Sequence, residues 1–122
     1  LNAARDQLVD ILRNYQSYRQ CPVILVFDAY KVPQNLGMVE KYHNIFIVYT
    51  QEAETADSYI ERVTYELRGR KRVRVATSDN LEQLIILGHG AVRVSAKSFH
   101  DEVMQTQQEI ERILAQNNQK NQ

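Results

Sequence analysis

The sequence is poor in cysteine: Cys21 stands alone among 122 residues, which excludes an intramolecular disulfide. No apolar run approaches the roughly 20 residues that a membrane-spanning helix requires, and no secretory leader is recognisable. We therefore expect a protein of the reducing cytoplasm. The 15 Lys and Arg residues balance the 15 Asp and Glu residues, so overall charge does not favour nucleic acid or anionic lipid. A partner of that kind must be bound by local charge.

Several common kinds of functional site are also missing. With only four glycines, the chain has neither of the usual Gly-rich phosphate loops. His43, His89 and His100 are too far apart in the sequence for a zinc site, and we expect His89, in a Gly-flanked turn, to be exposed. Cys21 precedes a proline and a predicted buried strand, which favours packing over a nucleophilic role. The chemistry must come from other residue types.

The sequence does contain a regular alternation of helical and strand-like periods. Its length supports one domain, which we place at residues 1–115, followed by a disordered polar tail at 116–122. Helical spacing of apolar residues predicts helices at about 2–18, 54–68, around 84–87 and from Phe99 to Leu114. Short apolar runs predict strands at 22–27, 45–49, 72–77 and 91–94, with a loop at 29–43 that has room for one helical turn.

The order of these segments predicts an α/β fold. Strands that alternate with helices and are almost entirely apolar are typical of a mostly parallel central sheet with helices on both faces. Right-handed crossovers place the carboxyl ends of parallel strands at one edge of the sheet, where ligands bind in open α/β folds. Residues that follow the strands are therefore the candidates for a functional site.

Acidic residues occur at this predicted edge. Asp28 ends a strand, and Asp79 comes two residues after another strand. Glu54 and Asp57 open the helix between them, and Glu61 shares their face of that helix. Converging carboxylates repel one another unless a hard divalent cation such as Mg²⁺ or Mn²⁺ lies between them. Two such ions can activate a water molecule at a phosphodiester.

The same residues also have a simpler explanation. Acidic side chains near a helix N-terminus are favoured by capping and by the helix dipole, which accounts for Glu54 and for Asp79 without any chemistry. Asp28 is harder to explain in this way, because it ends a buried strand. Spacing alone leaves both explanations open.

Four short segments follow one another in order along the chain: VFDA at 26–29, ETAD at 54–57, ATSD at 76–79 with Gln83, and GHGA at 88–91 followed by Ser95 and Ala96. Together they resemble the YacP-like NYN domain family of PIN-like, metal-dependent nucleases. The similarity extends from about residue 3 to residue 110. Bacterial members include a ribosome-associated endoribonuclease that cleaves messenger RNA during translation. The resemblance therefore implies a three-layer PIN-like fold and a metal-dependent endoribonuclease for single-stranded RNA, with mRNA on the ribosome as the expected substrate.

The resemblance also implies roles for individual residues. Asp28, Asp57 and Asp79 occupy the acidic motif positions of the family and are expected to be catalytic and to hold Mg²⁺ or Mn²⁺. Glu54 is a less secure fourth ligand. The family pattern has an earlier central strand that ends in Asp-Gly-Tyr-Asn and supplies another aspartate, and this sequence has no such segment. We therefore expect an N-terminally truncated domain, and the activity of these 122 residues on their own stays open.

Basic residues suggest where RNA would bind. Lys31, after the first predicted strand, and Lys97, at the start of the last helix, lie toward the acidic edge. At the opposite edge, five basic residues fall within seven positions: Arg68, Arg70, Lys71, Arg72 and Arg74. In this group Arg70, Lys71 and Arg72 are candidates for docking to RNA phosphates. The alternative is a solvated cluster that complements the dipole of the preceding helix.

Two other functions stay open. One is a non-catalytic module that binds RNA or the ribosome, and the other is a receiver-like domain, which the lack of an adjacent acid pair disfavours. We interpret Tyr59 and Tyr65, in helix 54–68, as packing residues and not as platforms for base stacking. No membrane partner is expected, and the oligomeric state is not indicated.

Overall fold

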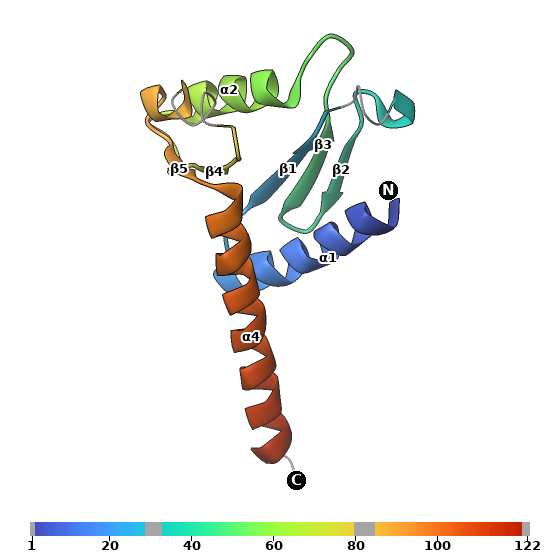
Figure 1. The fold of residues 1–122 in the computed structure, drawn as a ribbon, viewed down its shortest axis with the longest axis vertical. Helices are drawn as coiled ribbons and strands as arrows, with labels where there is room; N and C mark the ends of the chain where they lie inside the picture. The colour runs from blue at the N-terminus through green and yellow to red at the C-terminus, as the bar shows by residue number, and fades with distance from the viewer. Residues whose placement is uncertain (1, 29–32, 80–84, 121–122) are drawn as a thin grey trace.

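The computed structural model describes residues 2–28, 33–79 and 85–120. The elements labelled in Figure 1 are, in chain order, α1 (Asn2–Arg19), β1 (Val23–Phe27), β2 (Val39–Tyr42), β3 (Ile45–Tyr49), α2 (Ala56–Leu67), β4 (Arg74–Ala76), β5 (Val92–Val94) and α4 (Ala96–Lys120). A short 3-10 helix, η2 (Pro33–Asn35), precedes β2, and residues 85–88 are helical. The fold is mixed α/β, as the sequence predicts. None of these described helices combines the length and the apolar character needed to cross a membrane.

The strands form two sheets instead of the single predicted one. In the first sheet β1 pairs in parallel with β3, and β2 pairs antiparallel with the other edge of β3. In the second sheet β4 and β5 form a parallel pair. Among the described residues no strand joins the two sheets.

The strand β2 lies in a segment predicted to be loop. Among the strands that the structure describes, it pairs with β3 alone, and its outer positions face solvent: Val39 is 62% exposed and Tyr42 is 45% exposed. A strand at the edge of a sheet needs no buried face on both sides, so its sequence lacks a continuous apolar run. A two-residue turn connects it to β3, with His43 at a φ of 54°.

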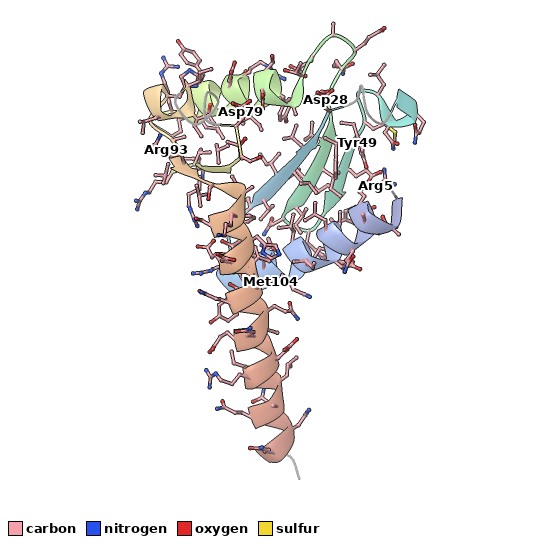
Figure 2. All side chains as sticks on the ribbon, in the orientation of Figure 1. Arg5, Asp28, Tyr49, Asp79, Arg93 and Met104 are labelled. Atoms are coloured by element: carbon pink, nitrogen blue, oxygen red, sulfur yellow. The ribbon has the colours of Figure 1, made fainter. Side chains whose placement is uncertain are left out.

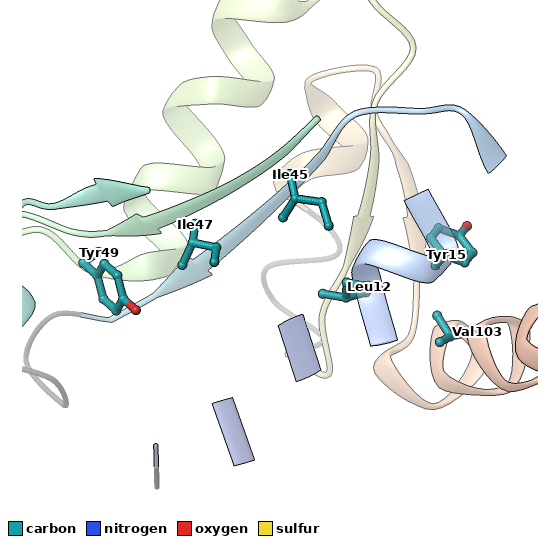
Figure 3. Packing of buried hydrophobic residues seen from close by; sticks show 6 residues of the cluster. All are labelled: Leu12, Tyr15, Ile45, Ile47, Tyr49 and Val103. Atoms are coloured by element: carbon teal, nitrogen blue, oxygen red, sulfur yellow. The ribbon is translucent and has the colours of Figure 1, made fainter. Parts of the chain in front are cut away.

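The main core lies between the three-stranded sheet and α1. Side chains at alternate positions of a strand share one face, and Ile45, Ile47 and Tyr49 of β3 all point toward α1 (Figure 3). Leu12 and Tyr15, three residues apart on α1, pack against them, together with Val103 of α4. These six side chains are at most 5% exposed. The core therefore fixes α1 and the first turns of α4 to one face of the sheet.

The opposite side of the sheet carries α2, which packs against β1 (Figure 1). A smaller cluster of Val75, Ile86 and Ala91 attaches the second sheet there, and Ile60 of α2 and Val73 pack against it. Helices on both faces are therefore confirmed, and so is the inward direction of Val75.

The predicted disordered tail is wrong for residues 116–120, which continue α4 as far as Lys120. No proline or glycine interrupts this segment, and Asn and Gln cost only a fraction of a kcal/mol each in a helix. The side chains at 111–119 are all exposed. In Figure 1 this end of α4 extends away from the rest of the molecule.

Candidate active site

Three predicted acidic residues are carried by separate elements. Asp28 follows β1 directly, Asp57 is the second residue of α2, and Asp79 comes three residues after the end of β4. Figure 2 labels Asp28 at the end of β1 and Asp79 beneath α2. The β1 end is held to β3, because the Thr50 amide donates to the Phe27 carbonyl at 3.2 Å. Asp28 and Asp79 thus follow the carboxyl ends of two strands that belong to different sheets, whereas Asp57 lies in a helix.

Local hydrogen bonds fix where α2 begins and hence where Asp57 lies. Thr55 is the N-cap, and its hydroxyl oxygen accepts the Ser58 amide proton at 3.0 Å. This contact satisfies an amide that the first helical turn leaves without a partner. Asp57 consequently occupies the first turn, where the helix dipole favours a negative charge.

Asp79 is positioned by the residue two places before it. The Thr77 hydroxyl oxygen accepts the Asp79 amide proton at 3.2 Å. Thr77 is itself tied to the second sheet, because its amide donates to the Val94 carbonyl at 3.2 Å. The turn that carries Asp79 is therefore anchored to β5.

The electrostatics of Asp57 connect it to the other acids. Its partial burial is the largest cause of a raised pKa, since burial disfavours the charged form. The negative charges of Asp79, Glu61 and Asp28, in that order, raise the pKa of Asp57 further. Carboxylates from β1, from the turn after β4 and from α2 itself therefore act on a single side chain. This arrangement stores repulsion that a bound cation would relieve.

The described acids do not form a complete set of metal ligands. In the described part of the chain, no three Asp, Glu, His or Cys side chains are arranged closely enough to hold a metal ion. Their chemistry nonetheless fits Mg²⁺ or Mn²⁺, which prefer carboxylate oxygens and keep several water ligands. Glu61, a residue that the sequence places on the same helix face, joins the group through its effect on Asp57.

Glu54, the predicted fourth ligand, lies differently. Its carboxylate accepts a hydrogen bond from the Arg62 guanidinium at 3.2 Å, and its charge is absent from those that shift the pKa of Asp57. The same guanidinium lies 3.7 Å from the carboxylate of Glu66, one turn further along α2. The structure therefore gives Glu54 a neutralising partner.

The predicted RNA-binding residues fall into two places. Lys97 is exposed in the first turn of α4, and Lys31 lies outside the described residues. Arg70, Lys71 and Arg72 are exposed in the connection between α2 and β4, beyond the end of α2 that is remote from Asp57. The predicted separation between the acids and this basic segment is present in the fold.

Two residues were interpreted wrongly from the sequence. Tyr65, expected to pack, is 52% exposed, and His89, expected to be exposed, is half-buried against α2. The apolar stripe of α2 offers a signal for Tyr65, because Ile60, Val63 and Leu67 define a face that does not include it. No sequence signal places His89, whose contacts depend on how residues 85–90 fold back onto α2.

Comparison with known proteins identifies the family. The YacP-like NYN domain profile matches residues 1–122. A protein of Bacillus subtilis (strain 168) named "Uncharacterized protein YacP" is 41% identical over 110 residues, which are 89% of this chain and 64% of that protein. The crystal structure of Rae1 (YacP) from Bacillus subtilis matches with a TM-score of 0.81 and 35% identity, over 98% of this chain and 68% of the other. A mutant form of Rae1 matches with the same TM-score. The chain, which spans about two thirds of the length of these relatives, belongs to the YacP-like NYN domain family.

Proposed function

We propose that this chain is the catalytic domain of a metal-dependent endoribonuclease that cleaves single-stranded RNA. The family is PIN-like, and its domains have a nuclease-type, RNA-related role. The proposal is carried by the placement of Asp28 directly after β1, of Asp57 in the first turn of α2 and of Asp79 in the turn after β4, together with the raised pKa of Asp57. Several carboxylates near the carboxyl ends of strands suit hydrolysis by an activated water.

In this proposal Asp28, Asp57 and Asp79 hold Mg²⁺ or Mn²⁺. The cation, when bound, supplies charge stabilisation at the phosphate and lowers the pKa of a water molecule. The carboxylates orient the attacking water, whose oxygen forms a bond to phosphorus as one carboxylate accepts its proton. The bond to the leaving ribose oxygen breaks, and that oxygen takes a proton from solvent. Lys97 and Lys31 bind flanking phosphates. The family resemblance further supports mRNA on the ribosome as the substrate and the cytoplasm as the location.

Replacing Asp79 tests the proposal. Asp79→Asn keeps the size of the side chain and its backbone hydrogen bond to Thr77, so we expect normal folding. Removing one carboxylate should lower the rate of cleavage by at least about 100-fold, a typical loss for one electrostatic group at a reacting centre. The assay follows a labelled single-stranded RNA with added Mg²⁺ and with EDTA.

The matched control is Glu52→Gln, an exposed acid in the loop before α2. It should cleave at the wild-type rate. Wild-type activity in Asp79→Asn, or cleavage that persists in EDTA, contradicts the assignment.

A second candidate function is RNA binding without cleavage. It is favoured by one observation, the exposed run of Arg70, Lys71 and Arg72 beyond the end of α2 that is remote from Asp57. This alternative requires RNA binding that is unchanged by Mg²⁺ and weakened by substitutions at Arg70, Lys71 and Arg72. A titration of labelled RNA with and without Mg²⁺, combined with the cleavage assay, separates the two functions.

A further inference from the structure

The last turn of α2 exposes a stacked pair of planar groups. The Arg68 guanidinium carbon lies 3.6 Å from the centroid of the Tyr65 ring, the closest cation-π contact among the described residues. The guanidinium also donates to the Tyr65 carbonyl at 3.0 Å, which fixes its orientation. Because Tyr65 is 52% exposed, this pair is accessible to solvent.

His89 restrains the ring from the side. The two rings meet edge to face, with centroids 5.7 Å apart and an angle of 73° between their planes. The His89 Nδ1 atom lies 3.1 Å from the hydroxyl oxygen of Thr64, which is 3% exposed. Since that hydroxyl donates its own proton to the Glu61 carbonyl, the His89 nitrogen is the donor. Tyr65 is thus held in place before any ligand arrives, which lowers the entropic cost of binding.

The surroundings of this pair carry uncompensated positive charge. Arg70, Lys71 and Arg72 follow Arg68 closely and are exposed, and no carboxylate in the described ranges pairs with them. Arg93 of the adjacent strand β5 extends outward near the same end of α2 (Figure 2). By contrast, Arg62 and Arg74 are neutralised by carboxylates.

We propose that Tyr65, Arg68, Arg70, Lys71 and Arg72 form a docking site for an unpaired nucleotide of single-stranded RNA. The base stacks on the exposed Arg68–Tyr65 pair, and the flanking phosphates contact the three following basic side chains. An acidic polypeptide without aromatic residues would pair with the basic side chains but would leave the stacking surface unoccupied. The inference rests on the proposed function only in taking RNA as the polymer, because none of these residues belongs to the acidic cluster.

The test measures binding of a fluorescein-labelled 12-nucleotide oligouridylate to the 122-residue chain by anisotropy in EDTA, so that cleavage plays no part. Stacking on an aromatic ring is lost in Tyr65→Ala, which should bind about 5- to 100-fold more weakly. Tyr65→Phe keeps the ring and should bind within about twofold of wild type. Arg68→Lys keeps the charge without the planar group and should also weaken binding.

Tyr42→Ala is the matched control. Tyr42 is 45% exposed on β2, and its hydroxyl lies beside the carboxylate of Glu40, away from the basic segment. It should bind like the wild type, and circular dichroism should show that all variants are folded. Equal affinity of Tyr65→Ala and Tyr42→Ala overturns the proposal. A second result would also overturn it: polyglutamate of equal charge displaces the RNA, and Tyr65→Ala changes neither the affinity for the oligouridylate nor the affinity for polyglutamate. A wild-type cleavage rate in Asp79→Asn would instead contradict the nuclease proposal and leave this binding result intact.

Discussion

Asp57 carries a carboxyl group whose ionisation opposes folding. Its pKa is raised in the folded state by burial first and then by Asp79, Glu61 and Asp28. The folded protein therefore holds this proton more tightly than the unfolded chain does. The resulting stabilisation is complete below the unfolded pKa and is lost as the pH rises through the folded pKa.

Because the raised pKa makes the ionised Asp57 side chain unfavourable in the folded protein, we make a prediction for Asp57→Asn. This substitution removes the ionisable group and keeps the shape of the side chain. We expect a higher melting temperature than wild type at pH 7 in EDTA, and a difference that shrinks toward zero near pH 3. Thermal unfolding followed by circular dichroism at both pH values measures it. Glu52→Gln, which is exposed, should show neither effect. A loss of stability at pH 7 would mean that Asp57 makes a favourable contact that outweighs the repulsion.

At the scale of elements, Glu102 of α4 connects three parts of the fold. Its carboxylate accepts a hydrogen bond from the Tyr15 hydroxyl of α1 at 2.6 Å and from the Arg74 guanidinium of β4 at 3.2 Å. Arg19 lies 3.9 Å away. Burial and the bond to Glu102 raise the pKa of Tyr15 to about 12. Burial alone would raise the pKa of Glu102, but the bonds from Tyr15 and Arg74 and the charges of Arg74 and Arg19 lower it overall.

We predict that Glu102→Ala lowers the free energy of unfolding by about 1–3 kcal/mol, because it leaves the Tyr15 hydroxyl and the Arg74 guanidinium without their acceptor. Urea denaturation at pH 7 measures this change. Since the pKa of Glu102 is lowered in the fold, the difference from wild type should narrow as the pH falls through that pKa. Glu111→Ala, on an exposed turn of the same helix, should stay within about 0.5 kcal/mol of wild type.

The elements also show what the sequence can and cannot predict. Strand β3 matches its predicted limits, because Ile45 to Tyr49 is buried on both faces and therefore continuously apolar. The end-of-strand position of Asp28 follows from topology, and its action on Asp57 could be anticipated. The ion pair between Glu54 and Arg62 could not be anticipated from the sequence. The helix α2 begins two residues after Glu54, which allows the Glu54 side chain to reach Arg62. The strand β2 could not be predicted from apolar periodicity either, because most of its residues are exposed.

At the scale of the molecule, the far end of α4 lies outside the packed body. Residues 111–119 are exposed, and the last buried positions of the helix are Val103 and Thr106. We predict that deletion of residues 116–122 changes the melting temperature by less than about 2 °C, because the described side chains of this segment, at 116–119, are all exposed. Val103→Ala, in the main core, should instead lower the free energy of unfolding by about 1–3 kcal/mol.

Amide hydrogen exchange tests the same description of α4. It should be fast at 111–119 and slow at 99–106, and uniform protection along α4 would contradict this description.

The length of α2 has a consequence for any RNA that uses both of its ends. Asp57 lies in the first turn of α2 and Tyr65 in its last turn, and eight residues at 1.5 Å each separate them by about 12 Å along the helix. A rigid helix keeps that span constant. An RNA whose base is bound at Tyr65 would reach the carboxylates after a fixed number of nucleotides. Cleavage would then occur at a constant distance in sequence from the bound base.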